Sequence, residues 1–309
     1  MTLRLVIFLL MTGLLGQLAH AAGPAHQRDP QLSARECKML LRPERFADRS
    51  AGVRELLKLV REACSISGLV FITANDTEAE SVRFVSFLDT PKFDLYKRGY
   101  VLRHRQDALV DRYGKCRVAT KKYELTFKFR HPEPTVAIEQ DTTPHSGFQG
   151  KESFEENLLV KETVIDRVYD RSGKVELKNK LGKKISDFSP IFPGLGKVGL
   201  SGSEEIVRVN ELEIEEYQRD LGTIELGTRA TGKAVVSVWY RRGEAKPLIA
   251  EFSFKTRLLS RDRLHSLINH TYRTSETLLR ELQKAGSTWI AVGTTKTGLV
   301  YQMSQPNQD

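Results

Sequence analysis

The stretch from Phe87 to Arg105 reads FLDTPKFDLYKRGYVLRHR and ends in the strand-like segment Leu102-Arg103-His104-Arg105. Successive side chains of a β-strand point to opposite faces, so Arg103 and Arg105 share one face, about 7 Å apart. Two guanidinium groups at this spacing on a rigid element suit a multiply charged oxyanion such as a phosphate chain. The stretch therefore predicts a strand that binds anions.

The same alternation recurs in three further segments, residues 36–40, 123–130 and 249–257. Their polar faces carry Glu36 and Lys38, then Thr126, Lys128 and Arg130, then Glu251, Ser253, Lys255 and Arg257. Taken singly, each segment is typical of a half-exposed strand with a solvated polar face. The four together favour a sheet closed into a barrel, with the polar faces around a central cavity and the apolar faces under helices.

These motifs resemble those of the CYTH, or triphosphate tunnel metalloenzyme, superfamily. Asp89-Thr90-Pro91, Leu102-Arg103-His104-Arg105 and Leu125-Thr126-Phe127-Lys128 are similar to its successive strand motifs, and Glu36-x-Lys38 is similar to the end of its opening Glu-x-Glu-x-Lys strand. The resemblance is densest from Arg35 to Arg130. It implies an α+β fold, an eight-stranded antiparallel β-barrel or tunnel with helices packed outside, in an exported and divergent member.

The resemblance also implies roles for individual side chains. Basic residues would bind the phosphates, and acidic residues would hold Mg²⁺ or Mn²⁺. The attacking water would be activated by a metal or by Lys38, the candidate catalytic residue. The implied phosphate-binding residues are Lys38, Arg103, Arg105, Lys128, Arg130 and Lys255. The implied metal ligands are Glu36, Glu251 and Glu156, the last from the acidic segment 152–156.

Two departures from the family pattern bear on the metal site. Ala34 stands where the first glutamate of the opening strand is expected, and Ser253 replaces a glutamate in the last strand. Because Mg²⁺ needs only one or two protein carboxylates, a weakened site could still bind metal. Two functions follow: a metal-dependent phosphohydrolase acting on a triphosphate or polyphosphate-like anion, or a non-catalytic module that binds an anionic ligand or an envelope partner.

The N-terminus has the pattern of a secretory signal peptide. Arg4 precedes an apolar run from Leu5 to Leu15, and Ala19-His20-Ala21 supplies small residues before a cut at Ala22. The alternative is an uncleaved membrane anchor, which needs about 18 to 20 apolar residues, and the run from Leu5 to Leu15 is shorter than that. We expect a signal peptide at 1–21, a CYTH-like tunnel domain at 22–285 and a C-terminal tail at 286–309. The mature protein would be exported, periplasmic or secreted, without a transmembrane anchor.

The chain is basic, with a formal net charge of +9. Such a surplus in an exported protein fits nucleic acid, anionic envelope polymers or a solvated surface. The basic residues recur singly along the strands, and no ribonucleoprotein or zinc-finger motif is present. We therefore expect a triphosphate or another polyanion as ligand and no duplex nucleic acid, and the oligomeric state stays open.

Export makes a disulfide possible among the three cysteines, Cys37, Cys64 and Cys116. Cys37 faces away from Glu36 and Lys38, toward the helix that should follow, which favours pairing with Cys64. The alternative is three buried, small, apolar side chains.

Apolar residues at helical spacing from Val53 to Cys64 predict one helix, capped by Asp48 or Ser50, and a second should begin after Ser260. Between them, strands are expected near 154–162, 207–217 and 233–242, which gives about eight strands in all.

Overall fold

The computed structural model describes residues 32–75, 80–227, 230–257, 265–291, 293 and 295–303. The expected leader, 1–21, and the cut before Ala22 lie outside these residues. Among the described helices, none has both the length and the apolar character needed to cross a membrane.

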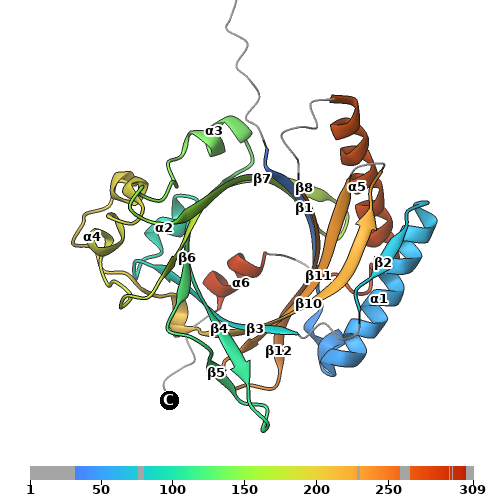
Figure 1. Cartoon of the computed structure of the whole chain (residues 1–309), viewed down its shortest axis with the longest axis horizontal. Coiled ribbons are helices and arrows are strands. Elements are labelled where there is room, and N and C mark those ends of the chain that lie inside the picture. Colours follow the sequence, from blue (N-terminus) through green and yellow to red (C-terminus); the bar gives the residue numbers. More distant parts are fainter. Residues whose placement is uncertain are drawn as a thin grey trace, which may run out of the picture.

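Twelve strands form a single sheet in the described part of the chain. They are β1 (Ala34–Leu41), β2 (Phe71–Thr73), β3 (Ser81–Asp89), β4 (Tyr100–Val110), β5 (Cys116–Val118), β6 (Tyr123–His131), β7 (Gly150–Val160), β8 (Ile165–Leu177), β9 (Val207–Arg208), β10 (Ile214–Glu225), β11 (Thr231–Arg241) and β12 (Pro247–Arg257). Nine of them close into a ring in the order β1-β7-β8-β6-β4-β3-β10-β11-β12 (Figure 1), because β10 pairs with β3 and β12 pairs with β1.

The α+β barrel expected from the sequence is therefore confirmed, although its ring differs in two details. Neighbouring ring strands are antiparallel except β1 and β7, which run parallel. The ninth strand, β8, was not predicted, because charged residues such as Asp166, Arg167, Asp170 and Arg171 fall on both of its faces and hide the apolar alternation. Each ring strand turns one face to the interior of the ring and the other face to helices or solvent.

Six α-helices accompany the sheet in the described residues. They are α1 (Arg49–Ile66), α2 (Asp94–Lys97), α3 (Pro134–Glu139), α4 (Ile185–Phe188), α5 (His265–Ala285) and α6 (Lys296–Gln302), with short 3₁₀ turns at Pro43–Phe46, Pro193–Lys197 and Val209–Glu211. The two long helices, α1 and α5, confirm the helices predicted from apolar spacing. Asp48 caps α1, since its side chain accepts a hydrogen bond from the Ala51 amide at 2.9 Å.

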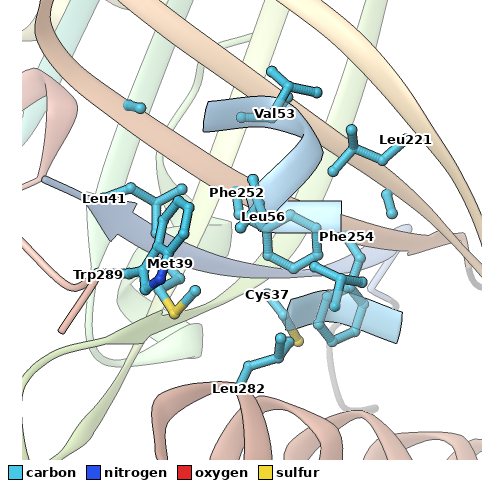
Figure 2. Close-up of a cluster of buried hydrophobic side chains, with 14 of the residues drawn as sticks. Cys37, Met39, Leu41, Val53, Leu56, Leu221, Phe252, Phe254, Leu282 and Trp289 are labelled. Atoms are coloured by element: carbon cyan, nitrogen blue, oxygen red, sulfur yellow. The ribbon is translucent and has the colours of Figure 1, made fainter. Parts of the chain in front are cut away.

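The main core lies outside the ring, between the apolar faces of the strands and helices α1 and α5. Figure 2 shows Cys37 and Met39 of β1 and Phe252 and Phe254 of β12 in this cluster, with Leu56 of α1. Cys37 and Cys64 are both buried there as free thiols, and Cys116 is also free. The predicted Cys37–Cys64 disulfide is therefore absent from the structure, and these two side chains act as the small apolar residues of the alternative.

A second apolar cluster closes one end of the ring from inside. Phe87 and Trp239 point inward from β3 and β11 and pack with Val300 and Tyr301 of α6. In Figure 1, α6 lies within the outline of the ring. The segment expected to be a tail from residue 286 onward is thus part of the barrel: Ile290 bridges to Leu41 of β1 before the chain enters the ring.

Candidate anion-binding cavity

The ring encloses a cavity of about 230 Å³, roughly the share of seven or eight water molecules in the liquid. Three glutamates and eight basic residues line it. The basic residues are Lys38, Arg103, Arg105, Lys128, Arg130, Lys174, Lys255 and Lys296. A larger hollow of about 840 Å³, beside His270 of α5, is lined mainly by neutral residues and lies apart from this cluster.

Strand alternation brings most of the predicted site residues together. All six predicted phosphate-binding side chains line the cavity, as do Glu36 of β1 and Glu251 of β12. They come from β1, β4, β6 and β12, which lie around the ring (Figure 1). Their roles in binding and catalysis stay predictions, but the shared cavity follows from the side-chain period of two along each strand.

Glu156 is the exception among the predicted metal ligands, and its placement was wrong. It shares a strand face with the buried Phe154 and Leu158, and its carboxylate pairs with Arg35 at 2.7 Å on the outer side of β1 and β7. Its neighbour Glu155 faces the cavity instead and pairs with Lys255 at 2.7 Å. The apolar partners of Glu156 at positions 154 and 158 were the signal that could have assigned the faces correctly.

Lys38 and Glu36 form an ion pair at 3.0 Å on β1. Burial alone would raise the pKa of Glu36, but Lys38 and Lys255 together lower it to about 2. For Lys38, burial works against the charge, but the pull of Glu36 and Glu251 dominates and raises the pKa of the amine. Lys38 is therefore a permanent cation at neutral pH, which suits anion binding better than the predicted role as a base that activates water.

Asp170, on the unpredicted strand β8, organises the two basic residues of β6. Arg130 binds its carboxylate through Nε at 2.6 Å and through a second nitrogen at 2.9 Å, and Lys128 binds it at 2.8 Å. Burial opposes the charge of Asp170, but these cations hold its pKa well below the usual range. Because one carboxylate serves two cations, positive charge is left over at this wall of the cavity.

Lys128 has an unusual titration. Burial disfavours its charged form, and Arg130, Lys38 and Arg103 add repulsion, so its pKa falls to about 8 even though Asp170 lies beside it. An amine with this pKa exchanges protons near neutral pH.

Arg103 and Arg105 meet their carboxylates only loosely. Arg103 lies 3.8 Å from Glu124, and Arg105 lies 3.5 Å from Glu216. The Nε atoms of both arginines are buried and have no hydrogen-bond partner among the described residues. A buried donor without an acceptor costs about 1 to 3 kcal/mol.

Lys296, on α6, was not predicted as a site residue, because it lies in the segment taken for a tail. Its ammonium group binds Glu251 at 2.9 Å and the hydroxyl of Ser237 at 2.7 Å. Strand alternation could have found Ser153 and Glu155 of β7, whereas Asp170, Ser172 and Lys174 lie on β8, where charge on both faces hides the alternation. No sequence pattern places Lys296 in the ring.

The carboxylates of the cavity do not fit a divalent metal. Each lies within 4.0 Å of at least one Lys or Arg nitrogen, and in the part of the chain that the structure describes no three His, Cys, Asp or Glu side chains gather into a metal-binding group. Mg²⁺ and Mn²⁺ need oxygen ligands directed at one point. Here the carboxylate oxygens are directed at ammonium and guanidinium groups instead.

Comparisons with known proteins give structural neighbours only, since no family model and no curated protein matches the chain. One neighbour is the proposed adenylyl cyclase HpAC1 from Hippeastrum, described as having a dominant triphosphatase activity, with 12% identity, a TM-score of 0.41 and coverage of 88% of this chain and 97% of that one. Another is a proposed adenylate cyclase from Bacillus halodurans, with 9% identity, a TM-score of 0.37 and coverage of 86% and 98%. A third is the PH1819 protein from Pyrococcus horikoshii, with 15% identity, a TM-score of 0.32 and coverage of 81% and 89%.

The fold of this chain is assigned from its own ring of strands.

Proposed function

We propose that the chain binds triphosphate or a similar linear polyanion in the basic cavity of its barrel. The observation that carries this proposal is the pair Arg103 and Arg105, whose guanidinium groups lie 3.8 and 3.5 Å from their nearest carboxylates in a cavity lined by eight basic residues. Phosphate oxygens accept charge-assisted hydrogen bonds from guanidinium groups in a forked geometry that fits these donors.

The fixed network around the cavity supports binding by preorganisation. Asp170 holds Lys128 and Arg130, Glu36 holds Lys38, and Glu155 holds Lys255, so the basic side chains stand in position before the ligand arrives. A ligand then meets groups whose side-chain entropy is already lost, which favours affinity.

The test is calorimetric titration of the purified protein with inorganic triphosphate in the presence of a chelator. We expect one triphosphate to bind per chain, with an affinity that falls as salt is added, because charge-assisted contacts are screened. An absence of detectable binding at low salt would remove the ligand class and leave the fold assignment intact.

A second candidate function is hydrolysis of the bound polyanion, the phosphohydrolase hypothesis of the sequence analysis. One observation favours it: the Lys128 amine, with a pKa of about 8, lies in the same cavity as the arginines. Such a group can exchange a proton with a water or a leaving oxygen near neutral pH, while the arginines stabilise negative charge.

A phosphate-release assay separates the hydrolase from the non-catalytic module. Triphosphate and nucleotides are incubated with the protein in chelator, in Mg²⁺ and in Mn²⁺. Phosphate release in chelator indicates hydrolysis by the side chains alone. Phosphate release only with metal supports the metal-dependent phosphohydrolase. Binding without any phosphate release supports the non-catalytic module for an anionic or envelope ligand.

We also propose that the protein is exported and acts in the periplasm or outside the cell. The support is the leader pattern at 1–21 in the sequence.

A further inference from the structure

Lys296 lies in a cage of oxygen atoms contributed by three neighbouring strands. Glu251 of β12 lies 2.9 Å from its ammonium nitrogen, Ser237 of β11 lies 2.7 Å away, and Glu216 of β10 lies 3.7 Å away. The same nitrogen lies 4.7 Å from the centroid of the Trp239 ring. With 13% of its side chain exposed, Lys296 is largely shielded from water.

The cage would be unstable without a cation in it. Glu216 is 2% exposed and keeps Arg83, Arg105 and the Trp239 indole as partners besides Lys296, so it is Glu251 that depends on Lys296 for a cation. Glu251 has Lys296 as its ion-pair partner in the described residues. A buried carboxylate that loses its cation is strongly destabilising. A cation is therefore required at this point of the cavity.

The fold delivers that cation through a well-anchored segment. The Asn210 side chain donates a hydrogen bond to the Val300 carbonyl at 2.7 Å, and the Tyr301 hydroxyl donates to Asp89 at 3.1 Å. Val300 is 1% exposed within the apolar cluster that closes the ring. These contacts fix α6, so that Lys296 reaches the carboxylates from one defined direction.

We propose that Lys296 is a tethered cation that occupies the position a divalent metal would otherwise have to fill between Glu216 and Glu251. An ammonium group offers three donors to oxygen atoms, and here Glu251, Ser237 and Glu216 surround it. The tethered cation repels a metal ion electrostatically and takes its space. If the proposed function holds, polyanion binding in this barrel needs no metal ion.

The proposal predicts that removing the ammonium group creates a metal site. In Lys296→Met, a side chain of similar length without charge leaves Glu251 without a cation, beside the Ser237 hydroxyl and next to Glu216. One or two carboxylates with waters suffice for Mg²⁺-type ions. We expect the wild-type protein to bind no Mn²⁺ at millimolar concentration and Lys296→Met to bind one Mn²⁺ per chain, measured by the loss of the free Mn²⁺ paramagnetic resonance signal.

Lys174→Met is the matched control. Lys174 also lines the cavity, but it lies beside Glu124 alone, at 3.7 Å, and Glu124 keeps Arg103 as a second partner. Its removal leaves no carboxylate without a cationic partner, so this variant should show no gain in Mn²⁺ binding. A gain in both variants would mean that any loss of positive charge attracts Mn²⁺, and would overturn the proposal.

Two further results decide the remaining cases. A folded Lys296→Met variant that gains no Mn²⁺ binding overturns the proposal. Should that variant fail to fold, the wild-type protein decides alone: Mn²⁺ binding that disappears in Glu251→Gln overturns the proposal, and its absence at millimolar Mn²⁺ supports it. Triphosphate is absent from these titrations, so failure of the proposed function would leave a gain of Mn²⁺ binding in Lys296→Met standing.

Discussion

The ring of Tyr301 stacks on the ring of Tyr96, with centroids 3.9 Å apart and an angle of 10° between the planes. Tyr96 belongs to α2, which follows the Asp89-Thr90-Pro91 motif, and Asp89 accepts hydrogen bonds from the Leu95 and Tyr96 amides as well as from the Tyr301 hydroxyl. The Asp89-Thr90-Pro91 motif thus has a structural role in this chain: it ties α2 to the helix that closes the ring.

The first prediction concerns this anchor. Tyr301→Ala should lower the free energy of unfolding by about 3 kcal/mol, because a large buried aromatic side chain is removed. Tyr301→Phe should lower it by about 1.5 kcal/mol, since only the hydrogen bond to Asp89 is lost. Urea unfolding measures both. Tyr113→Ala is the control: with 73% of Tyr113 exposed, a change within about 0.5 kcal/mol is expected.

The second prediction concerns the basic walls of the cavity. Arg103→Ala or Lys128→Ala should each weaken triphosphate binding in chelator by about 1.5 to 3 kcal/mol, the range for a hydrogen bond to a charged group. Calorimetric titration at fixed ionic strength measures the loss. Arg117→Ala removes an arginine from β5 that is 74% exposed and lies outside the cavity, so its effect should be small. Equal losses in all three variants would point to a general effect of net charge.

The third prediction is a dependence on pH. Burial, with repulsion from Arg130 and Lys38, lowers the pKa of Lys128 to about 8, so the free protein loses this cation as the pH rises through that value. The proposed polyanion would bind the protonated form, so its affinity should be highest below about pH 7 and fall by about tenfold toward pH 9.

Lys128→Arg is the matched variant for this test, since a guanidinium group stays protonated over the whole range. Titrations at several pH values and constant ionic strength should show a flatter profile for Lys128→Arg than for the wild type. The same slope in both proteins would assign the effect to the ligand or to another group.

Much of the cavity could be predicted from the sequence because its chemistry follows strand alternation. Lys38, Arg103, Lys128 and Lys255 stand on polar faces opposite apolar residues, and a period of two places them inside once the sheet closes. The prediction for Glu156 was wrong because the acidic segment 152–156 was treated as one group, without assigning alternate residues to opposite faces of the strand. The segment contains residues of both faces.

Other parts of the site could not be predicted from local sequence patterns. Strand β8 carries charge on its inner and outer faces, since Asp170 binds the β6 cations while Arg167 pairs with Glu156 and Glu276 outside the ring. Lys296 reaches the cavity only because the chain turns back after α5. The inner face of β8 and the position of Lys296 both depend on contacts between residues far apart in the sequence. Such contacts leave no pattern in a short stretch of sequence.

The fourth prediction concerns the leader, which lies outside the described residues. The small residues Ala19 and Ala21 fit the pattern of signal cleavage, so the mature N-terminus should be at Ala22 or close to it. Intact-mass measurement of the protein recovered from the exported fraction gives the answer. A product that keeps residues 1–21 and stays in the membrane would instead support the uncleaved anchor.

The last prediction follows from the three free thiols. Cys37 and Cys64 are 1% exposed and burial raises their pKa values, that of Cys64 to about 11, whereas Cys116 is half-buried, with its sulfur 3.0 Å from the Tyr217 hydroxyl. Since the thiolate is the reactive form, all three should react slowly in the folded protein, and Cys116 should react first. Mass spectrometry after alkylation should show one modified cysteine in the native state and three after unfolding without reductant. A single modified cysteine after unfolding, with the other two joined, would support the predicted Cys37–Cys64 disulfide in the exported protein.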